Sequence, residues 1–169
     1  VNPVFGYKVY YPKSWAVGNV DENYRSVLFS TLTGESVEIR AIEKTSPDGS
    51  FADWFAQWAP TEKITDLTEF VTAFKDKGWQ RSDGLVYYLE TPRRVYVLVY
   101  HTTDSTVVNF EIVAKMMARS FRLPLTDEVF VAPIIEASGE ETVANEAGLI
   151  MDTTSASDIS TTPVTSSEI

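Results

Sequence analysis

Cysteine is absent from the 169-residue sequence, and histidine occurs only once, as His101. Without thiols the chain can form no disulfide and offers no thiolate nucleophile, and a single imidazole cannot supply the usual ligands of a zinc site. Neither a Walker A motif nor the Rossmann glycine pattern occurs, so we expect no cofactor. No apolar run approaches the roughly 18 residues of a membrane-spanning helix, so we expect no membrane insertion of this segment.

Basic residues are absent beyond position 122. Residues 1–122 hold 14 basic and 15 acidic residues, whereas residues 123–169 hold none and 9. A nearly neutral body without a run of lysines and arginines lacks the charge that binding to a phosphate backbone requires, and an acidic tail repels that backbone further. We therefore do not expect nucleic acid to be a partner.

Composition divides the chain into three parts. Residues 1–123 carry apolar residues at regular spacing, and residues 124–135 form an extension that ends in the apolar run VFVAPII. Beyond it acids, serine and threonine dominate, and ten of the 17 residues from 153 to 169 are Ser or Thr. Such a segment cannot bury enough apolar surface to offset the entropy of ordering it. We predict one globular domain over 1–123 and a flexible acidic tail or linker over 136–169.

Alternating apolar residues predict several strands. In the stretch GYKVYYPKSW, Tyr7, Val9 and Tyr11 share one side of an extended segment, and Pro12 ends it. Two later pairs of such segments are each joined by a short turn, which is typical of β-hairpins. Gly34 stands where the first of these turns requires a positive φ, and Gly84 lies in the turn SDG that precedes the second pair. The predicted strands cover residues 7–11, 25–31, 35–43, 85–90 and 94–101.

Helical spacing occurs twice. Phe51, Trp54, Phe55 and Trp58 lie at i, i+3, i+4 and i+7, after Ser50 as a capping residue with Asp53 three positions on, so the sequence predicts a helix over 51–59. Because so short a helix needs docking to be stable, we expect both tryptophans to be mostly buried against the sheet.

A second helix is predicted over residues 109–121, with Asn109 as its cap. Between the two helices, residues 66–78 fit either structure. Leu67, Phe70 and Phe74 have helical spacing, with Gly78 placed as a helix stop, yet the same residues suit strands.

The order of these elements resembles the PsbP-like members of the Mog1/PsbP superfamily, which include secreted or lipid-anchored bacterial domains. The likeness is carried by GYKVYYPKSW, the strands around VLFS and VEIRAI, the hairpin VYYLETPRRVYVLVY and the terminal ARSF. It implies an α+β fold in which an antiparallel β-sheet is flanked by helices, an α-β-α sandwich, with residues 64–80 extended. Members of this superfamily share docking to partners rather than catalysis.

Few residues suggest chemistry. A hydrolase would need a base, and His101 with the nearby Asp104 is the candidate pair, although no G-x-S-x-G motif presents a serine. Asp21 and Glu22 offer oxygen ligands for calcium, but their spacing does not match an EF-hand loop. None of these patterns forms a recognisable active site.

Docking has two candidate regions. Arg93 and Arg94 are adjacent in the turn of the second hairpin, where they could contact an anion or a partner, or keep the hairpin tip soluble. The apolar residues 129–135 could instead add a strand to the sheet of a neighbouring chain.

These observations rank three functions. The first is a non-enzymatic, extracytoplasmic binding or accessory domain that docks to a protein or cell-envelope partner. We expect a signal or anchor upstream because the sequence starts at Val1 rather than methionine. The alternatives are a hydrolase that uses His101 and Asp104, and an assembly subunit joined by strand addition through residues 129–135.

The composition of the tail leads to a stability prediction. Deleting residues 136–169 should leave the midpoint of thermal unfolding nearly unchanged, because that segment contributes little burial. Circular dichroism melts of the full and shortened chains measure this. A drop of several degrees on deletion would show that the segment packs on the domain.

Overall fold

The computed structural model describes residues 1–103 and 110–129. All of them belong to the first of two compact units of the chain, Val1–Ile134. The predicted cap Asn109, most of the apolar run 129–135 and the predicted tail 136–169 lie outside the described residues.

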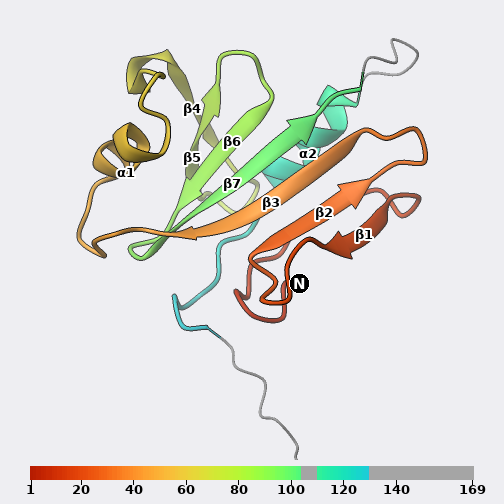
Figure 1. Cartoon of the computed structure of the whole chain (residues 1–169), viewed down its shortest axis with the longest axis horizontal. Helices are drawn as coiled ribbons and strands as arrows, with labels where there is room; N and C mark the ends of the chain where they lie inside the picture. The colour runs from red at the N-terminus through yellow and green to blue at the C-terminus, as the bar shows by residue number, and fades with distance from the viewer. Residues whose placement is uncertain (104–109, 130–169) are drawn as a thin grey trace, which may run out of the picture. The chain divides into compact units, whose positions relative to one another are not determined.

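The described residues form a seven-stranded antiparallel sheet in the order β1-β2-β3-β7-β6-β5-β4 (Figure 1). Strands β1, β2 and β3 pair in chain order, and so do β4, β5, β6 and β7. The long strands β3 and β7 join these two groups along eight residue pairs. Helix α1 (Phe51–Trp58) precedes a 3₁₀ turn, η1 (Ile64–Asp66), and α2 (Glu111–Ser120) follows β7. The strands are β1 (Ala16–Asn19), β2 (Ser26–Ser30), β3 (Ser36–Glu43), β4 (Leu67–Val71), β5 (Lys77–Arg81), β6 (Val86–Glu90) and β7 (Arg94–His101).

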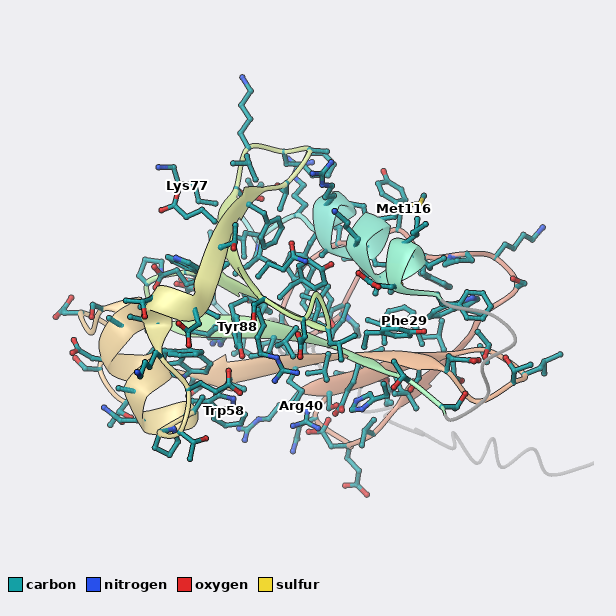
Figure 2. The ribbon with its side chains drawn as sticks, turned by 90° about the horizontal axis from the view of Figure 1, so that it is seen from above. Phe29, Arg40, Trp58, Lys77, Tyr88 and Met116 are labelled. Atoms are coloured by element: carbon teal, nitrogen blue, oxygen red, sulfur yellow. The ribbon has the colours of Figure 1, made fainter. Side chains whose placement is uncertain are left out.

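The central strands are buried on both faces. In β7, Val95 and Val97 point to one face, whereas Tyr96 and Leu98 point to the other, because side chains alternate along a strand. The first face packs against Phe51, Trp54 and Phe55 of α1, and the second against Ala114, Met117 and Ala118 of α2. Figure 2 shows Trp58 and Arg40 on one side of the sheet, and Met116 and Phe29 on the other. An antiparallel sheet with a helix on each face confirms the predicted α+β class.

The first helix begins as predicted. The hydroxyl of Ser50 accepts a hydrogen bond from the Asp53 backbone N–H at 3.1 Å and donates to the Asp53 carboxylate at 2.7 Å. This satisfies a donor that the first turn would otherwise leave free. The helix ends at Trp58, one residue before the predicted end. The second helix forms within its predicted range, 109–121. Phe110 occupies its N-cap position and makes no side-chain hydrogen bond there.

The strand predicted over residues 7–11 is wrong. This segment makes a single bridge to the rest of the chain, between Lys8 and Arg122, and the first strand of the sheet is β1 instead. The alternation is genuine but has another cause. Tyr7 is buried against the rings of Tyr96 and Phe121, with centroids 5.4 and 5.0 Å away, while the next residue, Lys8, faces solvent. A chain lying flat on the core shows the same period as a strand.

The helical alternative for residues 66–78 is also wrong. β4 and β5 form a hairpin here, and the Thr72 hydroxyl accepts hydrogen bonds from the backbone N–H groups of Phe74 and Asp76 in its turn. Gly78 is not a helix stop. A Cβ at this position would lie 2.5 Å from the Tyr88 carbonyl oxygen and 2.6 Å from the Phe70 ring, so the glycine permits close packing of strands and ring.

The two tryptophans of α1 differ. Trp54 is 7% exposed, as predicted, but Trp58 is 45% exposed, so the prediction that both are mostly buried is wrong for Trp58. The Trp58 ring stacks on the outer side of the Trp54 ring at 5.6 Å, which leaves its other side to solvent.

This difference predicts unequal costs of truncation. Trp54→Ala should lower the free energy of unfolding by about 3–5 kcal/mol, the range for a large aromatic removed from a core. Trp58→Ala should lower it by about 1 kcal/mol or less, as expected for a partly exposed site. Urea unfolding of the two variants measures both values. Equal losses would contradict the assignment of Trp54 alone to the core.

Candidate functional site

A polar network lies on the face of the sheet that carries α1, beyond the part that the helix covers. At its centre is Glu38 of β3, which is 7% exposed. One carboxylate oxygen accepts hydrogen bonds from the Ser26 hydroxyl at 2.5 Å and from Arg40 Nε at 2.7 Å. The other accepts from Arg40 Nη2 at 2.7 Å and lies 3.1 Å from His101 Nε2. Neighbouring strands thus direct four polar side chains to one point.

This environment fixes the charge of Glu38. The hydrogen bonds from Arg40, together with the weaker effects of Ser26 and His101, outweigh the opposing effect of burial and lower the pKa of the Glu38 carboxyl to about 2. A carboxylate whose two oxygens each have two partners holds its proton poorly, so it is a weak general base. The network instead links the side chains of the neighbouring strands β2, β3 and β7.

The candidate hydrolase residues are placed only in part. His101 is bonded to Glu38, and Asp104 lies outside the described residues. The Ser26 hydroxyl also donates to Glu38 rather than to His101. A serine nucleophile needs its hydroxyl bonded to the histidine that removes its proton. Within residues 1–103 and 110–129 we find no hydroxyl bonded to His101.

The candidate calcium residues serve a turn. The Asp21 carboxylate accepts hydrogen bonds from the backbone N–H groups of Arg25 at 2.8 Å and Ser26 at 3.4 Å, while Glu22 is exposed. These bonds hold the connection between β1 and β2, where Tyr24 has a φ of 56°. In the described part of the chain, no three acidic or histidine side chains gather where they could hold a metal ion.

The two candidate docking arginines have different environments. Arg93 is exposed, but Arg94 is 3% exposed and holds the extension that follows α2. Its Nη1 donates to the Asp127 carbonyl at 2.6 Å, its Nη2 lies 3.6 Å from the Glu43 carboxylate, and its guanidinium covers the Phe5 ring at 5.2 Å. Arg94 therefore packs inside the domain and is not a surface contact.

The structure contains an apolar groove that the sequence analysis did not identify. It lies between α2 and the segment that leads into β1, and its volume is about 350 Å³. We call it the α2 groove. A hydrogen bond from the Tyr10 backbone N–H to the Ser120 hydroxyl, 3.0 Å long, ties one wall to the other. The groove is lined by Tyr10, Tyr11, Pro12, Val113, Met116, Met117 and Ser120.

Large apolar side chains around this groove face solvent. Of the lining residues, Tyr10 is 73% exposed and Met116 65%; Ile112, one turn before Met116 on α2, does not line the groove but is 72% exposed. Figure 2 shows Met116 on the side of α2 that points away from the sheet. A sequence signal for this surface exists. Ile112 and Met116 lie four residues apart, outside the stripe of Val113 and Met117 that packs on the core.

Comparison with known proteins does not indicate a function for this chain. No family model matches the chain, and no curated protein matches it. A search of the described residues for a helix long and apolar enough to cross a membrane finds none.

The Glu38 network predicts a pH-dependent stability. A carboxyl whose pKa falls from 4.5 to about 2 on folding contributes stability that is complete above 4.5 and is lost as the pH falls towards 2. Glu38→Gln should therefore be less stable than wild type at neutral pH, and the difference should shrink between pH 4.5 and 2. Urea unfolding across this range measures it, with the exposed Glu69→Gln as the control for one lost charge. A difference that is independent of pH would contradict the low pKa.

Proposed function

We propose that the chain is a non-enzymatic binding or accessory domain that docks to a protein partner through the α2 groove. The observation that carries this proposal is the exposure of Tyr10 and Met116, which line an apolar groove. Contiguous apolar surface on a folded domain often marks an interaction site, because such surface is unfavourable in water. Methionine and tyrosine suit this use, since one adapts its shape and the other combines an apolar ring with a polar tip.

The fold and location belong to the same proposal. A sheet with helices on both faces supports a PsbP-like domain, whose relatives dock rather than catalyse, and an extracytoplasmic location would follow from that assignment. The occupied oxygens of Glu38 favour docking over the hydrolase alternative, because the one histidine is bonded to a carboxylate that already has three other hydrogen bonds.

Strand addition is a second candidate. All four residues of the edge strand β1 are exposed, so its outer side could accept a strand from another chain. A strand of four residues offers few backbone hydrogen bonds, however, and residues 130–135, which would supply the added strand, lie outside the described residues. The α2 groove therefore takes precedence.

Site-specific photocrosslinking tests the docking proposal. A photoreactive amino acid replaces Tyr10 or Met116 in cells that produce the protein, and adducts are identified by mass spectrometry. We expect the same partner protein to be captured from both positions, because both line one groove. The control is Val20, an exposed apolar residue that does not line it. Absence of adducts, or the same adducts from Val20, would contradict the proposal.

A further inference from the structure

We infer that two copies of this chain associate through their β1 strands, which pair antiparallel about a twofold axis at Gly18 and join two sheets into one. This inference does not depend on the α2 groove, because no residue of β1 lines it. It rests on the outward backbone groups of β1, on the absence of charge along this edge, and on the glycine at its centre.

The first observation is a row of backbone groups that face away from the sheet. Figure 1 shows β1 as the outermost strand, and each of its residues is exposed. The Val20 backbone N–H donates to the Ser26 carbonyl at 2.9 Å, in the same register as the pairing of β1 with β2. Because alternate residues of an antiparallel strand direct their N–H and C=O groups to opposite sides, those of Val17 and Asn19 point outward. Such groups are a template for a strand from another chain.

The second observation is the absence of charge along this edge. Residues 14–20, SWAVGNV, include no charged side chain. The opposite edge of the sheet differs, because β4 carries the exposed Glu69 at its centre. If two β4 strands paired about their centres, each Glu69 would face the other, and like charges placed directly opposite destabilise a pair of strands. Charged side chains are a common protection of sheet edges, so β4 is protected in this way and β1 is not.

The same absence favours a second copy over a strand of another sequence. A strand of another sequence is selected by opposite charges across the interface, and this edge offers none. A twofold pair needs only an edge that complements itself. With the axis at Gly18, Val17 lies opposite the second copy's Asn19, and each outward N–H and C=O of these residues has a partner. An axis at either neighbouring residue would instead pair Val17 or Asn19 with a position outside β1.

The third observation is Gly18 itself. On the axis the two glycines form a pair without hydrogen bonds between them, which is the closer kind of pair in an antiparallel sheet. A glycine within a strand often marks a place where another backbone approaches closely. Beside it, Val17 is 49% exposed and Val20 is 58% exposed. Their side chains point to opposite faces of the sheet, so an added strand would cover apolar surface on both.

Disulfide trapping of the full chain tests both the pairing and its register. Because the sequence contains no cysteine, an introduced cysteine is the only thiol of each chain. Gly18→Cys fits the structure, since a Cβ there would meet nothing within 4 Å. On the axis its two copies would have Cα atoms about 4.5 Å apart, within the range of a disulfide. Ala16→Cys is the matched control on the same face of the same edge, and its two copies would lie about 14 Å apart.

In a glutathione buffer, Gly18→Cys should form a disulfide-linked dimer about tenfold faster than Ala16→Cys, because only the first pair meets the geometry of the bond. Non-reducing gel electrophoresis measures both rates. A mixture of Ala16→Cys and Val20→Cys should form the mixed dimer faster than either variant alone links to itself, since the register places residue 16 opposite residue 20 of the second copy.

Sedimentation velocity tests the association without a crosslink. The sedimentation coefficient of wild type should rise with concentration, and the association should be weak because the strand is short. Val17→Lys should abolish the rise, since it places a charge at the paired edge. Val71→Lys is the matched control, because it adds the same charge at a valine of β4 that is 53% exposed. Circular dichroism verifies that each variant is folded.

Several outcomes would overturn the inference. Wild type could stay monomeric at about 1 mM, the weak end of specific association. Gly18→Cys could link no faster than Ala16→Cys, or Val17→Lys could leave the dimer intact, and either result would place the contact elsewhere. A dimer that is lost when residues 130–169 are deleted would identify the apolar run as the paired strand. Each of these results leaves docking at the α2 groove untouched, because that proposal is tested at Tyr10 and Met116.

Discussion

The fold depends on burying both faces of β7. This strand lies in the middle of the sheet, and each residue from Arg94 to Leu98 is buried. Because its side chains alternate, one set can avoid water only if α1 covers it, and the other only if α2 does. Two separate cores therefore share one strand. A change that shifted its register by one residue would exchange the two sets and disrupt both cores.

The same strand fixes the surface proposed for binding. The Tyr100 hydroxyl accepts a hydrogen bond from the Phe110 backbone N–H at 3.0 Å, at the start of α2. At the end of the helix, Phe121 packs against Tyr96 and Tyr7. Since both ends of α2 are attached to β7 or its neighbours, the outer stripe with Met116 has a fixed direction. A rigid surface binds with a smaller entropic cost than one that must first be ordered.

Sequence reasoning succeeded where local signals decide the structure. Ser50 and Asp53 form the predicted cap, Gly34 adopts the predicted positive φ, and the hairpin of β6 and β7 follows from its β-branched and aromatic residues. It failed where distant contacts decide. Nothing near Tyr7 in the sequence reveals that its ring packs against Tyr96 and Phe121, so the alternating pattern of this irregular segment predicts a strand that does not form.

The candidate site shows the same limit more strongly. His101 is a candidate because it is the one histidine of the sequence, but its partner Glu38 lies 63 positions away and is brought to it only by the pairing of β3 with β7. In the sequence Arg94 looks like a surface residue of a hairpin turn. In the structure its buried guanidinium donates to Asp127, a residue that follows the second helix. The α2 groove lies between two segments that are far apart in the sequence. Only the exposed Ile112 and Met116 on α2 give a signal of it in the sequence.

The attachment of Asp127 to Arg94 has a mechanical consequence. Arg94 is the first residue of the central strand, and the Arg93 backbone N–H also donates to the Asp127 carboxylate. Tension applied to the chain after residue 129 would therefore enter the sheet at its centre rather than peel away an edge strand. Before α2 could be pulled from its face, the buried guanidinium would have to leave both Asp127 and the Phe5 ring. The residues after α2 are thus anchored to the central strand, not to an edge of the sheet.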